Sequence, residues 1–202
     1  MLSVGVDSGA PDPLPDTRRM APDARTPPGQ ISTRTVYQSK WMSVREDTYT
    51  QPDGIVVTYG VVDKVDFAIV IAQEGDAFHL VEQFRYPIGQ RSWEFPMGTW
   101  PAGRSGTAEE LARQELQEET GLTAANWRQL GGRMHHATGF CSQGFTVFHA
   151  TDLMAGPHAR EATESDMVQA LVSEQEFREM IRDGRIVDGP TMAAYALFQL
   201  SG

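Results

Sequence analysis

The sequence contains a single cysteine, Cys141, among 202 residues. A disulfide within one chain needs two cysteines, and zinc sites built on thiolates use several, so both are excluded for a single chain. A protein without disulfides fits a reducing compartment, and the expected location is therefore the cytoplasm.

Long apolar runs are also missing. The chain has no stretch of about 18 consecutive apolar residues, so we expect no membrane span and no membrane partner. The first fifteen residues, MLSVGVDSGAPDPLP, have neither a basic start nor an adequate apolar core, so we expect no secretory signal there.

Positive charge is scarce, with 17 Lys and Arg against 27 Asp and Glu and a formal net charge of −10. Proteins that coat nucleic acid carry a basic stripe, so we expect no nucleic-acid partner. A phosphorylated small molecule remains a suitable ligand, because a bound metal ion can reverse the local sign of the charge.

Composition divides the chain into three parts. Residues 1–30 hold six of the twelve prolines and few large apolar residues, which predicts a disordered tail. Residues 31–65 are rich in β-branched residues and predict an N-terminal β-strand region. Residues 66–202 alternate strand and helix patterns and predict one larger domain with a full core.

Two hairpins are expected, around Pro52-Asp53-Gly54 and around Glu74-Gly75-Asp76. Segment 85–97 (RYPIGQRSWEFPM) is expected to be a loop, because it is rich in Pro, Gly and aromatic residues. Strands are predicted at 35–37, 44–49, 55–62, 67–72, 78–83, 127–134, 145–150 and 167–172, and late helices at 173–182 and 191–200. Mixed strands with helices inserted late predict an α+β fold with a mixed sheet between helices.

The most informative segment is 107–122, TAEELARQELQEETGL. Thr107 and Glu110 form the pattern of a helix capping box, and Gly121 stands where a left-handed C-cap is needed. On a helix, one side carries Ala108, Leu111, Ala112, Leu122 and the three carboxylates Glu115, Glu118 and Glu119. The other side carries Glu109, Glu110, Arg113, Gln117 and Thr120, and is expected to face solvent.

Three like charges on the inward side of a helix repel one another, and burying an unpaired carboxylate costs several kcal/mol. A cation must compensate, and oxygen ligands favour a hard divalent ion, Mg²⁺ or Mn²⁺. The alternative is a solvated run of charge. We favour the metal site, because the carboxylates fall on the apolar side of the helix.

Residues 114–122 (QELQEETGL), preceded by Gly98, resemble the Nudix box, G-x5-E-x7-R-E-U-x-E-E-x-G-U with U aliphatic. The segments WMSVRED and VEQFRYPIGQRSWEFPMG resemble those of ADP-ribose and nucleotide-sugar pyrophosphatases within that family. The resemblance covers about residues 36–200, and it makes 66–202 the Nudix hydrolase domain. It implies a Nudix-type α/β/α sandwich with a mixed β-sheet and an N-terminal antiparallel β-hairpin region, dependence on Mg²⁺, and hydrolysis of a diphosphate linked to another moiety.

The box departs from the family pattern at two positions. Gln114 stands where the family has Arg, and counting back eight residues places the family's first Glu at Gly106. The segment from Gly98 to Gln114 is also two residues longer than the family spacing. In the family these two side chains usually form an ion pair, and losing both leaves no buried charge without its partner.

The resemblance implies roles for individual residues. Glu115 and Glu119 would be the main metal ligands, with Glu118 sharing the metal or assisting catalysis beside it. The backbone carbonyl of Met97 would be a further ligand, since the family uses the residue before the box glycine. The catalytic base would come from the later loop HAREATESDM, which offers Glu161, Glu164 and Asp166; we favour Glu164, although all three could be surface charges.

The expected substrate-binding residues are Arg85, Glu94, Trp41 and Gly98. Arg85 suits a phosphate or the terminal ribose, but pairing with a nearby carboxylate such as Glu94 is equally consistent with the sequence. Trp41 is a candidate to stack on a nucleobase, and the alternative is a core role.

The expected reaction is the Mg²⁺-dependent hydrolysis of a small nucleotide sugar, ADP-ribose first of all, to AMP and ribose 5-phosphate. Two alternatives stay open: a hydrolase that removes modified nucleoside triphosphates, and a catalytically weak Nudix module that binds nucleotide sugars. The resemblance also implies a homodimer paired through the N-terminal strands.

Overall fold

The computed structural model describes residues 29–156 and 166–201. Residues 1–28 of the expected disordered tail, 1–30, lie outside the described residues. Its last two residues, Gly29 and Gln30, belong to the first strand. Within the described ranges, no helix has the length and apolar character needed to span a bilayer.

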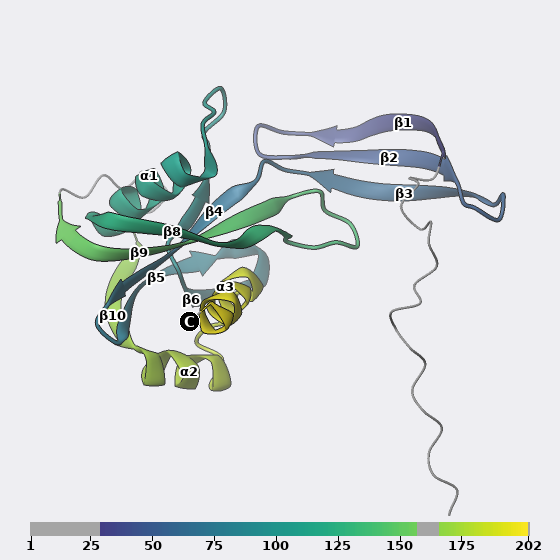
Figure 1. The fold of residues 1–202 in the computed structure, drawn as a ribbon. Coiled ribbons are helices and arrows are strands. Elements are labelled where there is room, and N and C mark those ends of the chain that lie inside the picture. Colours follow the sequence, from purple (N-terminus) through teal and green to yellow (C-terminus); the bar gives the residue numbers. More distant parts are fainter. Residues whose placement is uncertain (1–28, 157–165, 202) are drawn as a thin grey trace, which may run out of the picture.

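The N-terminal region forms a separate three-stranded antiparallel sheet. Its strands are β1 (Gly29–Gln38), β2 (Ser43–Thr50) and β3 (Val56–Asp63), in the order β1-β2-β3. The expected hairpin between β2 and β3 is confirmed, and Gly54 supplies the left-handed conformation of its turn at φ 86°. The sheet extends away from the rest of the molecule (Figure 1).

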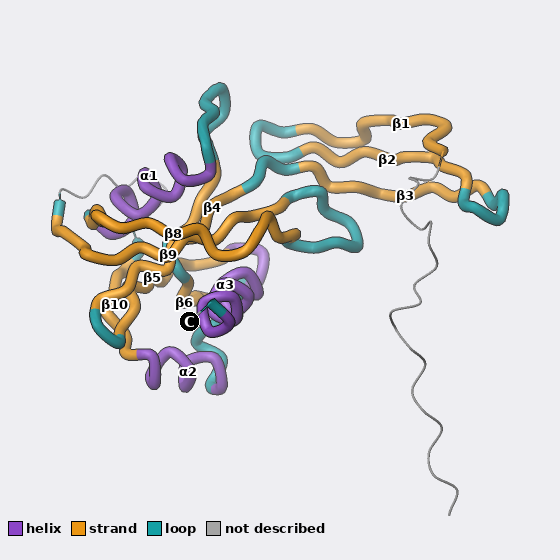
Figure 2. Tube along the Cα trace, viewed as in Figure 1, coloured by secondary structure: helices purple, strands orange, loops and turns teal. Residues whose placement is uncertain are grey.

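The larger sheet has seven strands and contains the core. β4 (Phe67–Glu74), β5 (Ala77–Arg85), β8 (Leu122–His135), β9 (Gly144–Ala155) and β10 (Val168–Ser173) lie in the order β10-β5-β4-β9-β8. β4 and β9 are parallel, while the other pairs are antiparallel, so the predicted mixed sheet is confirmed. Figure 2 shows β8 and β9 side by side, and β10 beside β5.

The expectation of a loop at 85–97 is wrong. After a short 3-10 helix at Tyr86–Ile88, Gly89 turns the chain at φ 66° into β6 (Gln90–Glu94), which pairs with β5. β7 (Met97–Thr99) then pairs with β4. Pro87 and Pro96 fall outside these two strands, so the prolines mark the breaks between short strands.

Helices cover both faces of the larger sheet. α1 (Ala108–Thr120) packs on one face, and α2 (Glu174–Arg182) and α3 (Gly189–Leu200) pack on the other. β4 alternates between the two cores: Ala68, Val70 and Ala72 join the cluster beneath α1, while Phe67, Ile69 and Ile71 join the opposite cluster. The predicted α/β/α sandwich is confirmed.

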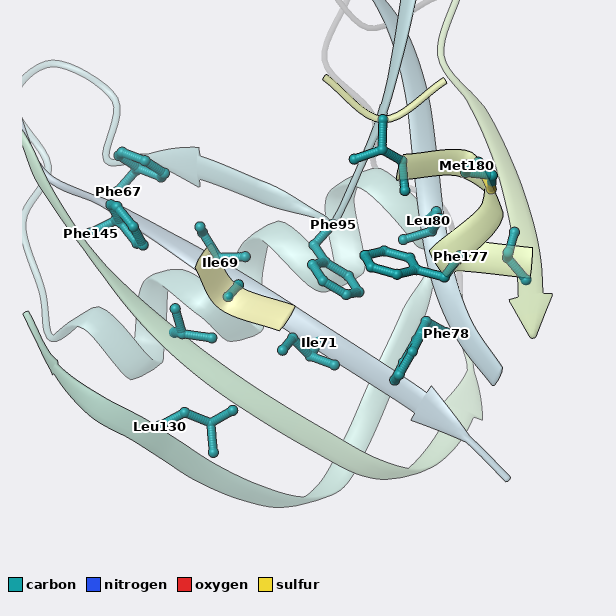
Figure 3. Close-up of a cluster of buried hydrophobic side chains, with 14 residues drawn as sticks. Phe67, Ile69, Ile71, Phe78, Leu80, Phe95, Leu130, Phe145, Phe177 and Met180 are labelled. Atoms are coloured by element: carbon teal, nitrogen blue, oxygen red, sulfur yellow. The ribbon is translucent and has the colours of Figure 1, made fainter. Parts of the chain in front are cut away.

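The core on the α2 side is aromatic. Phe78, Phe95 and Phe177 are fully buried, and the Phe95 and Phe177 rings stack with centroids 5.1 Å apart (Figure 3). Phe95 belongs to the segment between β6 and β7, so this contact fixes that segment against α2.

A loop from the larger domain pairs with the N-terminal sheet. The Val62 N–H of β3 donates to the Phe140 carbonyl at 2.8 Å, and the Ser142 N–H donates to the Val62 carbonyl at 3.0 Å. Nearby, the Arg133 guanidinium donates two bonds to Asp66, at 2.6 and 2.8 Å. The two sheets are therefore joined by backbone pairing, and the ion pair attaches the connection between β3 and β4 to β8.

Candidate active site

α1 begins and ends as its sequence predicts. The Thr107 hydroxyl accepts from the Glu110 N–H at 3.1 Å, and the Glu110 carboxylate accepts from the Thr107 N–H at 2.8 Å. Gly121 closes the helix at φ 70°. One expectation for the outer face is wrong: Thr120 is buried, because its hydroxyl donates to the Leu116 carbonyl and its side chain turns inward.

The inward carboxylates of α1 lie as expected. Glu115 is 6% exposed and Glu119 is 2% exposed, one helical turn apart, whereas Glu118 is half-buried. Glu118 accepts a hydrogen bond from the Gln114 amide at 2.8 Å. The residue that replaces the family's Arg therefore contacts one of the three acidic side chains.

β7 lies against these carboxylates. The Met97 N–H donates to Oε2 of Glu119 at 3.0 Å. A Cβ built on Gly98 would lie 2.3 to 2.5 Å from all three atoms of the Glu115 carboxyl group, a separation that real Cβ atoms do not reach. A side chain at position 98 would therefore displace the Glu115 carboxylate, which occupies that space.

Arg85 and Glu94 form a two-pronged ion pair across β5 and β6. Arg85 Nε donates to Glu94 Oε1 at 2.8 Å, and Nη2 donates to Oε2. Of the two roles that the sequence left open for Arg85, pairing with Glu94 is the one present. The Arg85 side chain is still 37% exposed, while that of Glu94 is 1% exposed.

Burial and the partner's charge shift the pKa values of Arg85 and Glu94 in opposite directions. Burial raises the pKa of the Glu94 carboxyl above its ordinary value, and the hydrogen bonds from Arg85 only partly reverse this. Burial lowers the pKa of Arg85, but hydrogen bonds and the charge of Glu94 outweigh it and leave a net rise. The charge of Glu119 contributes to that rise, so the ion pair and the α1 carboxylates share one electrostatic environment.

The carboxylates of α1 supply some, but not all, of the oxygen ligands that a hard cation needs. Across residues 29–156 and 166–201, no three His, Cys, Asp or Glu side chains are grouped closely enough to hold a metal ion alone. Mg²⁺ usually binds through one or two carboxylates and keeps water or substrate oxygens as its other ligands. The pair Glu115 and Glu119, beside the Met97 and Gly98 backbone, is compatible with that kind of site.

Trp41 belongs to another part of the molecule. It lies in the turn between β1 and β2, is 67% exposed, and stacks beneath the Lys40 ammonium, which is 4.5 Å from its ring centroid. Its exposure rules out the core role that the sequence had left open. A hollow of about 440 Å³ adjoins it, lined by Gln38, Ser39, Lys40, Trp41, Met42, Ser43, Asp63, Lys64, Val65 and Ser142.

The favoured base, Glu164, and its neighbour Glu161 lie outside the described residues. Asp166, the third acidic residue of that segment, is described. Its carboxylate accepts from Arg91 Nη1 at 2.8 Å and its carbonyl from Nη2 at 3.0 Å. Because Arg91 also donates from Nε to Glu82 at 2.7 Å, it joins the start of β10 to β5 and β6.

Sequence reasoning missed Arg91, because it lies in the segment taken as a loop. The alternation in Gln90–Glu94 was the available signal: Ser92 and Glu94 are buried, and Arg91 is exposed. The contact between Arg133 and Asp66 was missed as well. It joins residues 67 positions apart, which no local pattern indicates.

Comparison with known proteins covers nearly all of the described chain. Residues 62–194 match the NUDIX domain, and residues 30–62 match the nucleoside diphosphate sugar hydrolase N-terminal domain. A mouse (Mus musculus) protein described as ADP-sugar pyrophosphatase is 33% identical over an alignment 102 positions long, which covers 45% of this chain. The match spans 46% of the mouse protein, less than half of its length.

The fold has a close structural counterpart. A crystal structure described as ADP compounds hydrolase superposes with a TM-score of 0.74 and covers 86% of this chain and 93% of the other. Sequence identity is 17%, so this likeness supports the fold and not the choice of substrate.

Proposed function

Because this chain belongs to the Nudix family, we propose that it hydrolyses the diphosphate bond of a nucleoside diphosphate sugar with the help of Mg²⁺. The observation that carries the proposal is the contact between β7 and α1. There, two buried carboxylates, Glu115 and Glu119, lie against a glycine and a backbone amide. Carboxylate oxygens in this position are the ligands that a hard divalent ion takes.

Glu115 and Glu119 would hold the metal ion, with the Met97 carbonyl as a further oxygen ligand and Glu118 beside them. Mn²⁺ would be accepted by the same oxygen donors. When bound, the ion neutralises diphosphate oxygens and lowers the pKa of a bound water. Gln114 holds Glu118 by its amide at 2.8 Å, which keeps this carboxylate near the other two.

ADP-ribose is the proposed substrate, with AMP and ribose 5-phosphate as products. One water molecule is added across the P–O–P bridge: the bond from one phosphorus to the bridging oxygen breaks, and that phosphorus receives the oxygen of water. The other phosphorus keeps the bridging oxygen. The name of the mouse relative, an ADP-sugar pyrophosphatase, supports an ADP derivative. The match to the N-terminal domain of nucleoside diphosphate sugar hydrolases supports a sugar on the other phosphate.

The remaining residue roles are proposals of the same kind. Glu164 would act as the base that activates water. Arg85, steered by Glu94, would offer the exposed part of its guanidinium to the substrate. Trp41 would stack on the nucleobase, which its 67% exposure allows.

The test is a substrate panel with Mg²⁺: ADP-ribose, other ADP-sugars, GDP-sugars, dinucleotides and nucleoside triphosphates. We expect ADP-ribose to be hydrolysed fastest and the activity to disappear with EDTA. Glu119→Gln should lower kcat by at least about 100-fold. The matched control, Glu109→Gln, makes the same change on the exposed side of α1, where Glu109 pairs with Arg113, and should keep full activity.

The panel also separates the alternatives. Fastest turnover of triphosphates would favour the removal of modified nucleotides. Tight calorimetric binding of ADP-ribose without any product would favour a binding module, which Gly106 and Gln114 make a reasonable second candidate. Neither hydrolysis nor binding anywhere on the panel would reject the proposed function.

A homodimer through the N-terminal sheet is part of the proposal. Several large apolar side chains of this sheet are exposed, among them Tyr37 at 52%, Val56 at 57% and Tyr59 at 43%. Val56 and Tyr59 are three positions apart on β3 and point to opposite faces of the sheet, so a second chain paired with it would cover side chains on either face. Sedimentation equilibrium should give twice the mass of the chain, and a monomer at micromolar concentration would contradict this expectation.

A further inference from the structure

The segment that leads from β7 into α1 is exposed over residues 101–107. Trp100, directly after β7, is the exception: it is half-buried and packs against the hydrophobic cluster beneath α1. β7 itself has three residues, so its own pairing with β4 is short. The end of β7 therefore depends on Trp100 for its position against the helix.

The ring of Trp100 also lies against Gly106, near the end of this segment. A Cβ built on Gly106 would lie 2.7 Å from Cζ2 of Trp100 and 2.8 Å from Oε2 of Glu110, so the ring and this carboxylate together fill the space of a side chain at position 106. The φ angle of Gly106 is outside the left-handed region, and glycine is needed here for space and not for backbone conformation. The Arg104 guanidinium lies 5.3 Å from the ring centroid.

This contact connects two points of the chain that flank the carboxylates. Trp100 is two residues beyond Gly98, and Gly106 immediately precedes the residue that caps α1. Gly98 and Met97 in turn contact Glu115 and Glu119. A shift of Trp100 would move this stretch of backbone relative to both carboxylates.

We propose that Trp100 is a positioning residue, which by packing on Gly106 holds Met97 and Gly98 at the spacing from α1 that the carboxylates need to bind a divalent ion. This role rests on the proposed metal site. A side chain that merely filled the core would affect stability alone. A positioning side chain must also change the metal affinity, because a misplacement of about 1 Å is enough to cost roughly 100-fold in rate.

Trp127 provides a matched control. It packs against the same hydrophobic cluster. Like Trp100 it has a guanidinium over its ring, here that of Arg113, which lies 4.6 Å from the ring centroid. It comes from β8, whereas the proposed metal site is built from β7 and α1. Trp127→Ala should therefore lower stability much as Trp100→Ala does, without affecting the metal.

The experiment measures Mn²⁺ affinity by electron paramagnetic resonance without substrate, together with kcat, KM and the urea midpoint. For W100A we expect Mn²⁺ affinity to fall at least about 10-fold and kcat to fall more than KM rises. W100F should recover most of both, and W127A should bind Mn²⁺ like the wild type. G106A, which deletes no core side chain, should reproduce the effect of W100A and keeps the test valid if W100A does not fold. A Cβ at position 106 would also meet Glu110, so E110A is its control and should bind Mn²⁺ like the wild type.

Two outcomes would overturn the role of Trp100: W100A and G106A that bind Mn²⁺ as tightly as the wild type, or W127A that loses as much affinity as W100A. A wild-type chain that binds no Mn²⁺ would overturn the metal site itself. The wild-type measurement therefore separates a failure of the proposed function from a failure of this inference.

Discussion

Gly98 and Glu115 are in direct contact: the position of a Cβ on Gly98 is 2.3 Å from Oε2 of Glu115. The two residues come from β7 and α1, 17 positions apart, and their contact places backbone beside a carboxylate that is 6% exposed. Adding one methyl group at position 98 should therefore disturb the Glu115 carboxylate.

Gly98→Ala should displace the Glu115 carboxylate, because the added methyl and the carboxyl group cannot occupy the same space. We expect kcat to fall by about 100-fold or more, with far-UV circular dichroism unchanged. Gly132→Ala is the control, since a Cβ there meets no atom within 4 Å. Equal activity of the two variants would show that Gly98 is not part of the site.

Arg85→Ala should destabilise the protein by about 3 to 5 kcal/mol, because it leaves the buried Glu94 carboxylate without its cation. Arg85→Ala combined with Glu94→Gln should be less destabilised than Arg85→Ala alone, since the second change removes the charge. Urea unfolding of the two single variants and the double variant measures this coupling. Additive effects would mean that the pair contributes nothing to stability.

The ion pair between Arg133 and Asp66 should make the free energy of unfolding decrease in acid. Hydrogen bonds from Arg133 lower the pKa of Asp66, burial opposes this, and a bond from the Gly144 N–H lowers it further. A carboxyl group with a lowered folded pKa stabilises the fold above its unfolded pKa, and this contribution is lost as the pH falls through the folded value. The pair is about half exposed, so the loss should be no more than about 1 kcal/mol.

Thermal unfolding from pH 6 down to acid measures this contribution. Asp66→Asn should be less stable than the wild type at neutral pH, and the difference should shrink in acid. Asp76→Asn, in the exposed turn between β4 and β5, is the control. A difference between Asp66→Asn and the wild type that stays constant at every pH would exclude the ion pair as its cause.

Arg91→Ala should loosen the start of β10, because Arg91 donates to both the carboxylate and the carbonyl of Asp166. We expect faster hydrogen exchange at the first amides of β10 and only a small loss of unfolding free energy, as is usual for exposed ion pairs. Arg91→Lys should behave similarly, since an ammonium cannot reproduce the fork that reaches Asp166 and Glu82 together. Unchanged exchange in β10 would contradict this view of Arg91.

Local patterns were sufficient for α1 and for the sheet. The capping box of Thr107 and Glu110, the glycine at 121 and the apolar spacing depend on residues within one or two turns, so the sequence alone determined where the helix begins, ends and faces. The long runs of β-branched and apolar residues likewise determined most of the strands. Segment 85–97 was misjudged, because its Pro, Gly and aromatic residues were taken as signs of a loop and outweighed the short alternation in Gln90–Glu94.

The tertiary structure decided what surrounds the three carboxylates. It placed β7 beside α1, so that Gly98 meets Glu115 and Met97 meets Glu119, and it paired Arg85 with Glu94 where the sequence had left two roles open. It also filled the space at Gly106 with the ring of Trp100. The sequence determined which acidic side chains of α1 face the core. The packing of strands against the helix decided which groups contact them, because those contacts join residues that no short-range pattern relates.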